Sequence, residues 1–575
     1  MPGEGTRPAT GHHLHRILHR QGIEGCRRCL PILARTFSPI WLATTRACGE
    51  APGGGLGQSV SEARETFPAR DGSPLDPVKR CLLLLLGLLM LWTPGLIGNA
   101  RQSEAAAAQQ ASFFGLTNLW TIHITLTPKA WSTLNSRGGP PKRNGNGNGG
   151  LFEGIVRGVL GAEGGPRPGG VAGDYPWATC TFEGPGATLT NVAVRFKGAS
   201  SMVRSPNPFK RPFKVDFNRG ATNRRFLGIE ELYLNNNVND ATQMREALAY
   251  DLFRKAGLPA PRTAFASVYL TIPGKLQNLH LGLYTLVEVV EGDLLKRTLG
   301  TKKGLLLKPE MMRGVPYMGE EWDNYVERYA PKGDVDPRDA KRFIEFVRFL
   351  RQAPGEQFAE GLREFLEPEA FARFVALNAI LANVDSFIGN GHNYYLHVHP
   401  TTRKANFIPW DLNESFGMHP VSGPSRDQMV TSVLRPNADP NQLVERFVSD
   451  PTLGPLYRSQ VSLLLTNLFV PARLSAEIDR IAAITRPLVF AESRRAKEDF
   501  ERTVLGTRRP DDGDTSQPRH DQEFAREPYE PRGFPDAVEV DNMPLKKWIE
   551  GRAIHVQDQL DGKVRGTRPR PRLYQ

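Results

Sequence analysis

Cysteine is scarce in this chain of 575 residues, which contains five. Cys26, Cys29, Cys48 and Cys81 all lie at or before the start of an apolar segment at residue 81, which leaves Cys180 alone in the expected mature protein. One cysteine cannot form an intramolecular disulfide. The fold must therefore be held by its hydrophobic core, which a composition of 40% hydrophobic residues with 29 Phe and 8 Trp can fill.

Several common enzyme motifs are also missing. The sequence has no GxSxG, HExxH or Walker motif, which argues against the common hydrolases, the zinc peptidases and the P-loop enzymes. Acidic residues are rare between Arg195 and Arg225, where nine Lys and Arg residues face only Asp216. Such a basic strip favours an anionic ligand. Its phenylalanines alternate as core residues do, so a phosphate-facing cleft explains the strip better than nucleic-acid binding.

The first hundred residues predict export. Residues 1–78 form a low-complexity extension rich in Gly, Arg and Pro, which we expect to be disordered. Residues 79–100 combine a basic start, an uncharged apolar run and small residues up to Ala100. This pattern predicts a secretory signal peptide, with an uncleaved membrane anchor as the alternative. We therefore expect an extracellular, periplasmic or cell-envelope location.

Strand patterns come first along the chain and helix patterns later. Alternation of apolar and polar residues predicts strands at 119–127, 191–198, 211–218, 263–272 and 281–290. A period of 3.6 predicts helices at 336–353, 369–384, 455–469, 474–504 and 544–560. This order favours an α+β protein of two lobes over a doubly wound sheet.

The predicted organisation beyond the leader has five parts: a linker (101–118), a strand-rich N-lobe with a glycine-rich insertion (119–335), a helical C-lobe (336–506), a linker rich in Pro, Asp and Arg (507–540), and a final helix with a basic tail (541–575). One more helix is expected inside the N-lobe, at 239–259. Asp240 and Gln243 resemble a capping box at its start, and Gly257 and Pro259 end it.

The segment 383–417 places oxygen-bearing side chains around a short apolar hairpin. Asp385 precedes Asn390 by five residues, and Asp411 follows the hairpin. Carboxylates and amides hold oxygen-loving cations, and phosphoryl transfer needs a further carboxylate to orient the attacking hydroxyl. The D-x-x-x-x-N spacing followed by a hairpin-borne Asp matches the catalytic-loop and metal-Asp pattern of protein kinases.

The alternative is purely structural: Asp385 caps a turn, Asn390 takes a left-handed conformation beside two glycines, and Asp411 braces a bend. Such a turn would not need an apolar hairpin to gather all three groups.

Groups suited to a nucleotide lie upstream. Lys214 stands on a predicted strand among apolar residues, where its ammonium group needs a carboxylate or a phosphate, and Glu246 on the following helix is the first candidate partner. The stretch "RFKGASS" offers backbone N–H groups and two hydroxyls to phosphates, although an ordinary turn is an equal alternative. Its polar side chains are Lys197, Ser200 and Ser201. Glu288 begins the expected hinge beside an adenine ring.

These stretches together resemble the spore-coat protein H (CotH) kinase family, an atypical, secreted-type branch of the protein-kinase-like fold. The resemblance runs from about residue 119 to 506, with the final helix included, and rests on the following motifs: "VRFKGASS", "RPFKVDFN", "DATQMREALAYDLFRKAGLPAPR", "GLYTLVEVVEGDLL", "DSFIGNGHNYYLH" and "FIPWDLNESFG". It implies transfer of the ATP γ-phosphate to Ser or Thr of an exported protein, with Mg²⁺ or Mn²⁺ as the cofactor.

The resemblance also implies roles for single residues. Asp385 would be the catalytic carboxylate and Asp411 the main metal ligand, supported by Asn390 and Asn393. Lys214 would hold the phosphates with Glu246 as its partner.

One position departs from the family pattern, because Asn413 stands where the family usually has a second Asp after "PWDL". If that Asp binds a second cation, its loss weakens the site. The alternative function is therefore that of a kinase-like surface protein with weak or no catalysis, which acts in adhesion or in envelope or coat assembly. A hydrolase using Asp385 and Asp411 without nucleotide is a third reading. His397 and His399 alternate on one strand face, as a possible transition-metal pair or simply an exposed face.

Overall fold

The computed structural model describes residues 108–136, 175–507 and 543–569, except positions 199, 206, 311, 421 and 439. The predicted extension, the apolar segment 79–100, the start of the first linker (101–107), most of the glycine-rich insertion and nearly all of the second linker (508–540) therefore lie outside the described residues.

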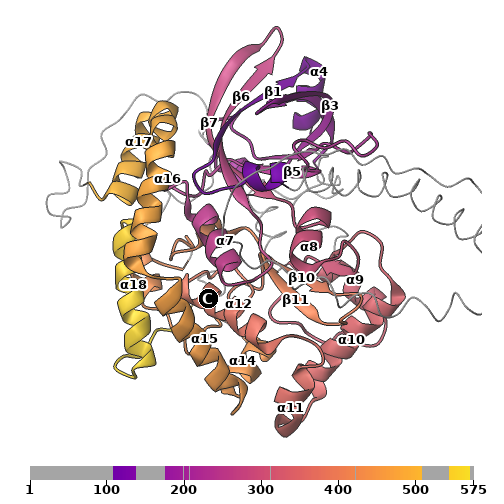
Figure 1. The fold of residues 1–575 in the computed structure, drawn as a ribbon, viewed down its shortest axis with the longest axis vertical. Helices are drawn as coiled ribbons and strands as arrows, with labels where there is room; N and C mark the ends of the chain where they lie inside the picture. The colour runs from indigo at the N-terminus through magenta and orange to yellow at the C-terminus, as the bar shows by residue number, and fades with distance from the viewer. Residues whose placement is uncertain are drawn as a thin grey trace, which may run out of the picture. The chain divides into compact units, whose positions relative to one another are not determined.

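A closed barrel forms the strand-rich part of the chain. Its strands are β1 (Leu119–Leu126), β2 (Ala178–Gly184), β3 (Ala187–Phe196), β4 (Phe213–Asp216), β5 (Glu231–Asn235), β6 (Thr263–Ile272) and β7 (Leu276–Glu288). The order is β1-β2-β3-β4-β5-β7-β6, and the parallel pairing of β1 with β6, as in Ile122 opposite Val268, closes the ring (Figure 1). Alternate side chains such as Val194, Val215 and Leu232 fill the interior.

A second sheet lies among the helices. It has the order β11-β10-β8-β9, with β8 (Leu305–Leu307), β9 (Pro331–Lys332), β10 (Tyr394–Val398) and β11 (Ala405–Pro409). β10 and β11 form the predicted antiparallel hairpin, with Tyr394 opposite Pro409. This hairpin carries the chain from the Asp385 loop to Asp411.

Helices make up most of the remaining chain. One helix, α7 (Arg245–Lys255), lies between the barrel strands β5 and β6 in the sequence. Between the barrel and the second sheet's hairpin the helices are α8 (Gly292–Leu299), α9 (Asp323–Tyr329), α10 (Pro337–Gln352), α11 (Gly355–Leu362) and α12 (Pro368–Ile380). Beyond the hairpin they are α13 (Ser425–Met429), α14 (Gln442–Ser449), α15 (Leu453–Asn467), α16 (Pro471–Glu492), α17 (Arg494–Phe500) and α18 (Leu545–Leu560). Short pieces are α4 (Pro128–Asn135), α6 (Ser200–Val203), η1 (Leu412–Glu414) and the π-helix η2 (Glu501–Leu505).

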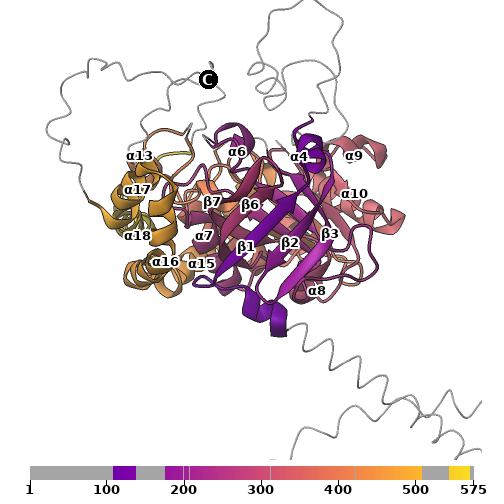
Figure 2. The ribbon, with the colours of Figure 1, turned by 90° about the horizontal axis from the view of Figure 1, so that it is seen from above.

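Two helices connect the barrel with the helical part. α7 contacts both strand β6 and η1, the short 3-10 turn that follows Asp411. α16 packs along β7 and also against α18, so the final helix joins the same body, as Figure 2 shows from above. Buried apolar residues form one cluster inside the barrel and a larger one among the helices and the second sheet.

These observations confirm the α+β class, while the two-lobed, kinase-like arrangement stays a prediction.

The structure corrects the start of the helix that was predicted from residue 239. α7 begins only at Arg245, and Gln243 has a positive φ of 55° that no helix allows. Asp240 still caps the helix, because its carboxylate accepts from the N–H of Arg245 at 2.8 Å, but Gln243 takes no part in a capping box. The predicted end holds, since Gly257 has a φ of 74°.

Within the described residues no single helix is both long and apolar enough to span a membrane. The bent pair α15 and α16 passes that test together, with a bend of 55° between its halves.

Candidate active site

The loop after α12 gathers two of the predicted amide side chains around the carboxylate of Asp385. Asn390 Nδ2 donates to Asp385 Oδ1 at 3.0 Å, and Asn393 Nδ2 donates to Asp385 Oδ2 at 2.7 Å. Gly389 permits this tight loop, because a Cβ there would stand 1.7 Å from the carbonyl oxygen of Val384. The structure therefore brings together Asp385, Asn390 and Asn393 on one short loop.

Asp411 lies beyond the hairpin in a left-handed conformation, with a φ of 49°. Its N–H donates to the hydroxyl of Tyr250 on α7 at 2.9 Å. Asn393 is also left-handed, with a φ of 51°. Asn390 does not have a positive φ, so the left-handed conformation that the structural alternative expected for it is wrong. Non-glycine residues held in this conformation cost energy and concentrate at functional sites.

The side-chain oxygen of Asn390 has no hydrogen-bond partner in the part of the chain that the structure describes. The residue is 6% exposed, and its buried Oδ1 has no hydrogen-bond partner among the described residues. An unpaired buried acceptor is costly, so it suits a ligand that arrives later. Amide and carboxylate oxygens, such as those of Asn390 and Asp411, are of the type that Mg²⁺ prefers, and a cation site formed by these two residues stays a prediction. The described residues contain no group of three or more His, Cys, Asp or Glu arranged to hold a metal ion.

Lys197 directly follows β3 and lies within electrostatic reach of Asp411. Its Nζ donates to Oδ1 of Asn235 at 2.5 Å, and Asn235 Nδ2 donates to both carboxylate oxygens of Glu246 at 3.0 and 2.8 Å. Burial lowers the pKa of Lys197, while the charges of Asp411 and Glu246 act against that shift. Burial also raises the pKa of Glu246 to about 7, with the carboxylate of Asp411 adding to the shift. Asn235 was not foreseen, although its alternation on β5 with Tyr233 placed it on this face.

Lys214 corrects the expected lysine–glutamate pair. Its Nζ lies 2.8 Å from Glu231 and 3.7 Å from Glu291, so its ion-pair partners are not Glu246. Burial opposes the charge of Lys214, yet Tyr233, Glu291 and Glu231 together raise its pKa. The physical reason is the register between β4 and β5. It places Lys214 opposite Tyr233, whereas the β5 residue that contacts Glu246 is Asn235, at the end of the strand.

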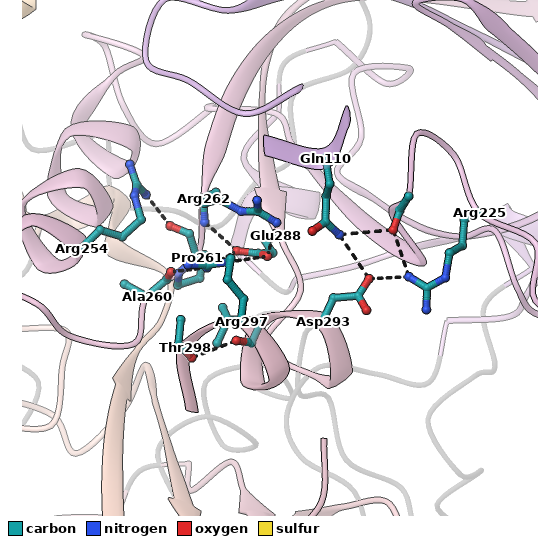
Figure 3. Close-up of polar contacts among 12 residues, drawn as sticks. Gln110, Arg225, Arg254, Ala260, Pro261, Arg262, Glu288, Asp293, Arg297 and Thr298 are labelled. Carbon is teal, nitrogen blue, oxygen red and sulfur yellow. Dashed lines mark hydrogen bonds and ion pairs between the residues drawn. The ribbon is translucent and has the colours of Figure 1, made fainter. Parts of the chain in front are cut away.

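The carboxylate of Glu288 is occupied by two arginines. Arg262 lies 2.7 Å and Arg297 2.6 Å from its oxygens, and Figure 3 shows Glu288 between them. Nucleotide binding by this hinge stays a prediction, and would have to use the backbone. A recess of about 420 Å³ beside it is lined by Glu288 and Val289 but by neither Lys197 nor Asp411. Figure 3 also shows the neighbouring contacts of Gln110 and Arg225 with Asp293.

The stretch that carries the predicted serines is tied to β5. Ser200 begins the short helix α6, and the backbone carbonyl of Ser201 accepts from Asn236 Nδ2 at 3.1 Å. The same amide donates to the carbonyl of Lys210 at 2.9 Å. Asn236 therefore fixes both ends of this loop, and phosphate binding by its hydroxyls stays a prediction.

Glu414 is an acid that the sequence analysis missed. Burial raises its pKa well above the usual range, and the charges of Asp385 and Asp411 add to the shift. Glu414, directly after Asn413, therefore lies within electrostatic reach of both predicted acids. The sequence did hold one sign of it, because Glu414 directly follows Asn413, the residue that differs from the usual family pattern.

His397 and His399 have structural roles. His397 is fully buried, which corrects the exposed strand face, and its Nε2 lies 3.0 Å from the carbonyl oxygen of Lys303. His399 Nε2 lies 3.2 Å from the carbonyl oxygen of Leu299.

Comparison with known proteins agrees with the resemblance. The family model described as CotH kinase protein matches residues 194–512. Inner spore coat protein H of Bacillus subtilis (strain 168) is 23% identical over 296 residues, which cover 51% of this chain and 77% of that relative. Because the family model matches more than half of the chain, the chain belongs to the CotH kinase protein family.

Proposed function

We propose that this chain is an atypical protein kinase that transfers the γ-phosphate of ATP to Ser or Thr of an exported or envelope protein. The observation that supports this best is the site formed from two loops: Asp385 with its two amides, and Asp411 within the electrostatic reach of Lys197 and Glu246. The family name points the same way.

In this proposal Asp385 accepts the proton of the attacking hydroxyl. The amides of Asn390 and Asn393 fix both of its oxygens, so the carboxylate is held in one orientation before substrate binds. Asn390 Oδ1 and the carboxylate of Asp411 would hold Mg²⁺ or Mn²⁺, which neutralises phosphate charge when bound. Lys197, rather than Lys214, would contact the phosphates.

An exported or envelope location belongs to the same proposal. It follows from the apolar segment 79–100 and agrees with the printed name of the relative, which is a spore coat protein. A kinase-like surface protein without catalysis is the second candidate, favoured by Asn413 in place of the family's second Asp.

The test is phosphoryl transfer by the purified full chain with labelled ATP and Mg²⁺, scored as autophosphorylation and as transfer to a protein mixture. Asp385→Ala should abolish transfer while leaving nucleotide-induced thermal stabilisation in place. Asp427→Ala, an exposed acid on α13, is the matched control and should keep full activity. A wild-type chain that neither transfers phosphate nor is stabilised by ATP would instead favour the binding role.

A further inference from the structure

His419 and Ser422 form a hydrogen-bonded chain behind the proposed metal ligand Asn390. Asn390 Nδ2 lies 3.2 Å from His419 Nε2, and His419 Nδ1 lies 2.6 Å from Ser422 Oγ. His419 is 4% exposed and follows Asp411 by eight residues, so it is a buried part of the same site.

The chemistry of Asp385 decides which way the amide of Asn390 faces. An ionised carboxylate only accepts hydrogen bonds, so the Asn390 atom 3.0 Å from Asp385 Oδ1 must be the nitrogen. That nitrogen carries two hydrogens, and the second points to His419 Nε2. Nε2 must therefore be the acceptor of a neutral ring, and Nδ1 the donor to Ser422 Oγ.

Because both hydrogens of Asn390 Nδ2 point to Asp385 and His419, Oδ1 of Asn390 has to face away from these two residues. It is the buried acceptor that has no partner among the described residues. We propose that His419, held in one tautomer by Ser422, is a positioning residue that directs Asn390 Oδ1 toward a bound divalent cation. This inference rests on the proposed function, because it assigns a supporting role at the same metal site.

Other charged groups lie near His419. Glu414 Oε2 lies 3.8 Å from His419 Nε2, while Asp385 and Arg204 act on the ring electrostatically. A side chain that supports a metal ligand typically contributes 10- to 100-fold to metal affinity. Replacing His419 leaves the Asn390 amide with its hydrogen bond to Asp385 but without the second one, so the amide should be held less firmly and the site should bind the cation more weakly.

The experiment measures Mn²⁺ binding to the full chain by electron paramagnetic resonance of free Mn²⁺, with and without ADP. His419→Phe should weaken Mn²⁺ binding by roughly 10-fold, and Ser422→Ala should weaken it less. His419→Gln, which keeps a buried acceptor, should recover part of the affinity. The matched control is a second histidine–serine pair among the described residues, His280 and Ser267, whose side chains lie 3.0 Å apart on the barrel. His280→Phe should bind Mn²⁺ like the wild-type chain.

Unchanged Mn²⁺ affinity in a folded His419→Phe variant would overturn the positioning role. If that variant does not fold, Ser422→Ala decides by the same criterion. Asp411→Asn separates this inference from the proposed function. Loss of Mn²⁺ binding in Asp411→Asn with normal binding in the His419 variants rejects only the positioning role. A wild-type chain that binds no Mn²⁺ even with ADP rejects the metal site, and the positioning role with it.

Discussion

Lys197 reaches Glu246 through an amide and not through a direct ion pair. Asn235 accepts from the lysine at 2.5 Å and donates to both glutamate oxygens. Among the described residues Lys197 therefore makes no ion pair with a carboxylate, although it lies within electrostatic reach of Asp411. A lysine in this state is available to an arriving phosphate group.

This geometry makes Lys197 the lysine whose removal should weaken nucleotide binding. A hydrogen bond to a charged group contributes about 1.5–3 kcal/mol, so Lys197→Met should weaken ADP affinity by about 10- to 100-fold. Lys214→Met is the control, because its ammonium group is already engaged by Glu231 and Glu291. It should change ADP affinity much less. Isothermal titration of ADP with Mg²⁺ measures both variants, and a larger loss in Lys214→Met would contradict the assignment.

Buried His397 should make the protein sensitive to acid. Burial lowers its pKa from 6.5 to about 4, so between these values the unfolded chain binds more protons than the folded one. The contribution of His397 to the free energy of unfolding is therefore fully present above pH 6.5. It falls by about 3 kcal/mol as the pH drops toward 4. His397→Gln removes the titrating ring, so the variant should lose less stability than the wild-type chain over this range.

Urea unfolding at pH 7 and at pH 4 measures this difference. His123→Gln, at a partly exposed site on β1, is the control and should follow the wild-type chain. Parallel acid losses in the wild-type chain and in His397→Gln would show that the buried ring does not titrate as described.

Local patterns predicted the elements and the Asp385 loop well. The period of 3.6 at residues 336–353 matches α10, and alternation at 263–272 matches β6. Asp385, Asn390 and Asn393 meet because one short loop carries them all, so their spacing in the sequence already limits their spacing in space.

Long-range pairing was out of reach. The barrel closes through β1 and β6, which are more than a hundred residues apart, and no local pattern encodes that contact. The partner of Lys214 depended on the register between β4 and β5, and period-two alternation gives the face of a side chain but not its neighbour on the next strand. For the same reason the role of Asn235 beside Glu246 was missed. Glu414 was missed for another reason: its burial next to Asp385 and Asp411 depends on tertiary packing, although it directly follows Asn413 in the sequence.

The pair Lys210 and Glu492 joins the loop before β4 to the end of α16. Lys210 Nζ lies 2.6 Å from Glu492 Oε2, and Oε1 of the same carboxylate accepts from the N–H of Leu283 at 2.6 Å. Gly282 makes this approach possible, since a Cβ there would stand 2.3 Å from Glu492 Oε1. Burial lowers the pKa of Lys210, and Glu492 counters that shift.

Glu492→Ala should lower the free energy of unfolding by about 3 kcal/mol, because it leaves a buried ammonium group and a backbone N–H without an acceptor. Lys210→Met combined with Glu492→Ala should cost less than the sum of the two single changes, since neither charge is then stranded. The control is the more exposed pair Lys404 and Glu367, also 2.6 Å apart, whose coupling should stay below about 1 kcal/mol. Additive effects of the Lys210 and Glu492 substitutions in urea unfolding would mean that the two side chains do not depend on each other.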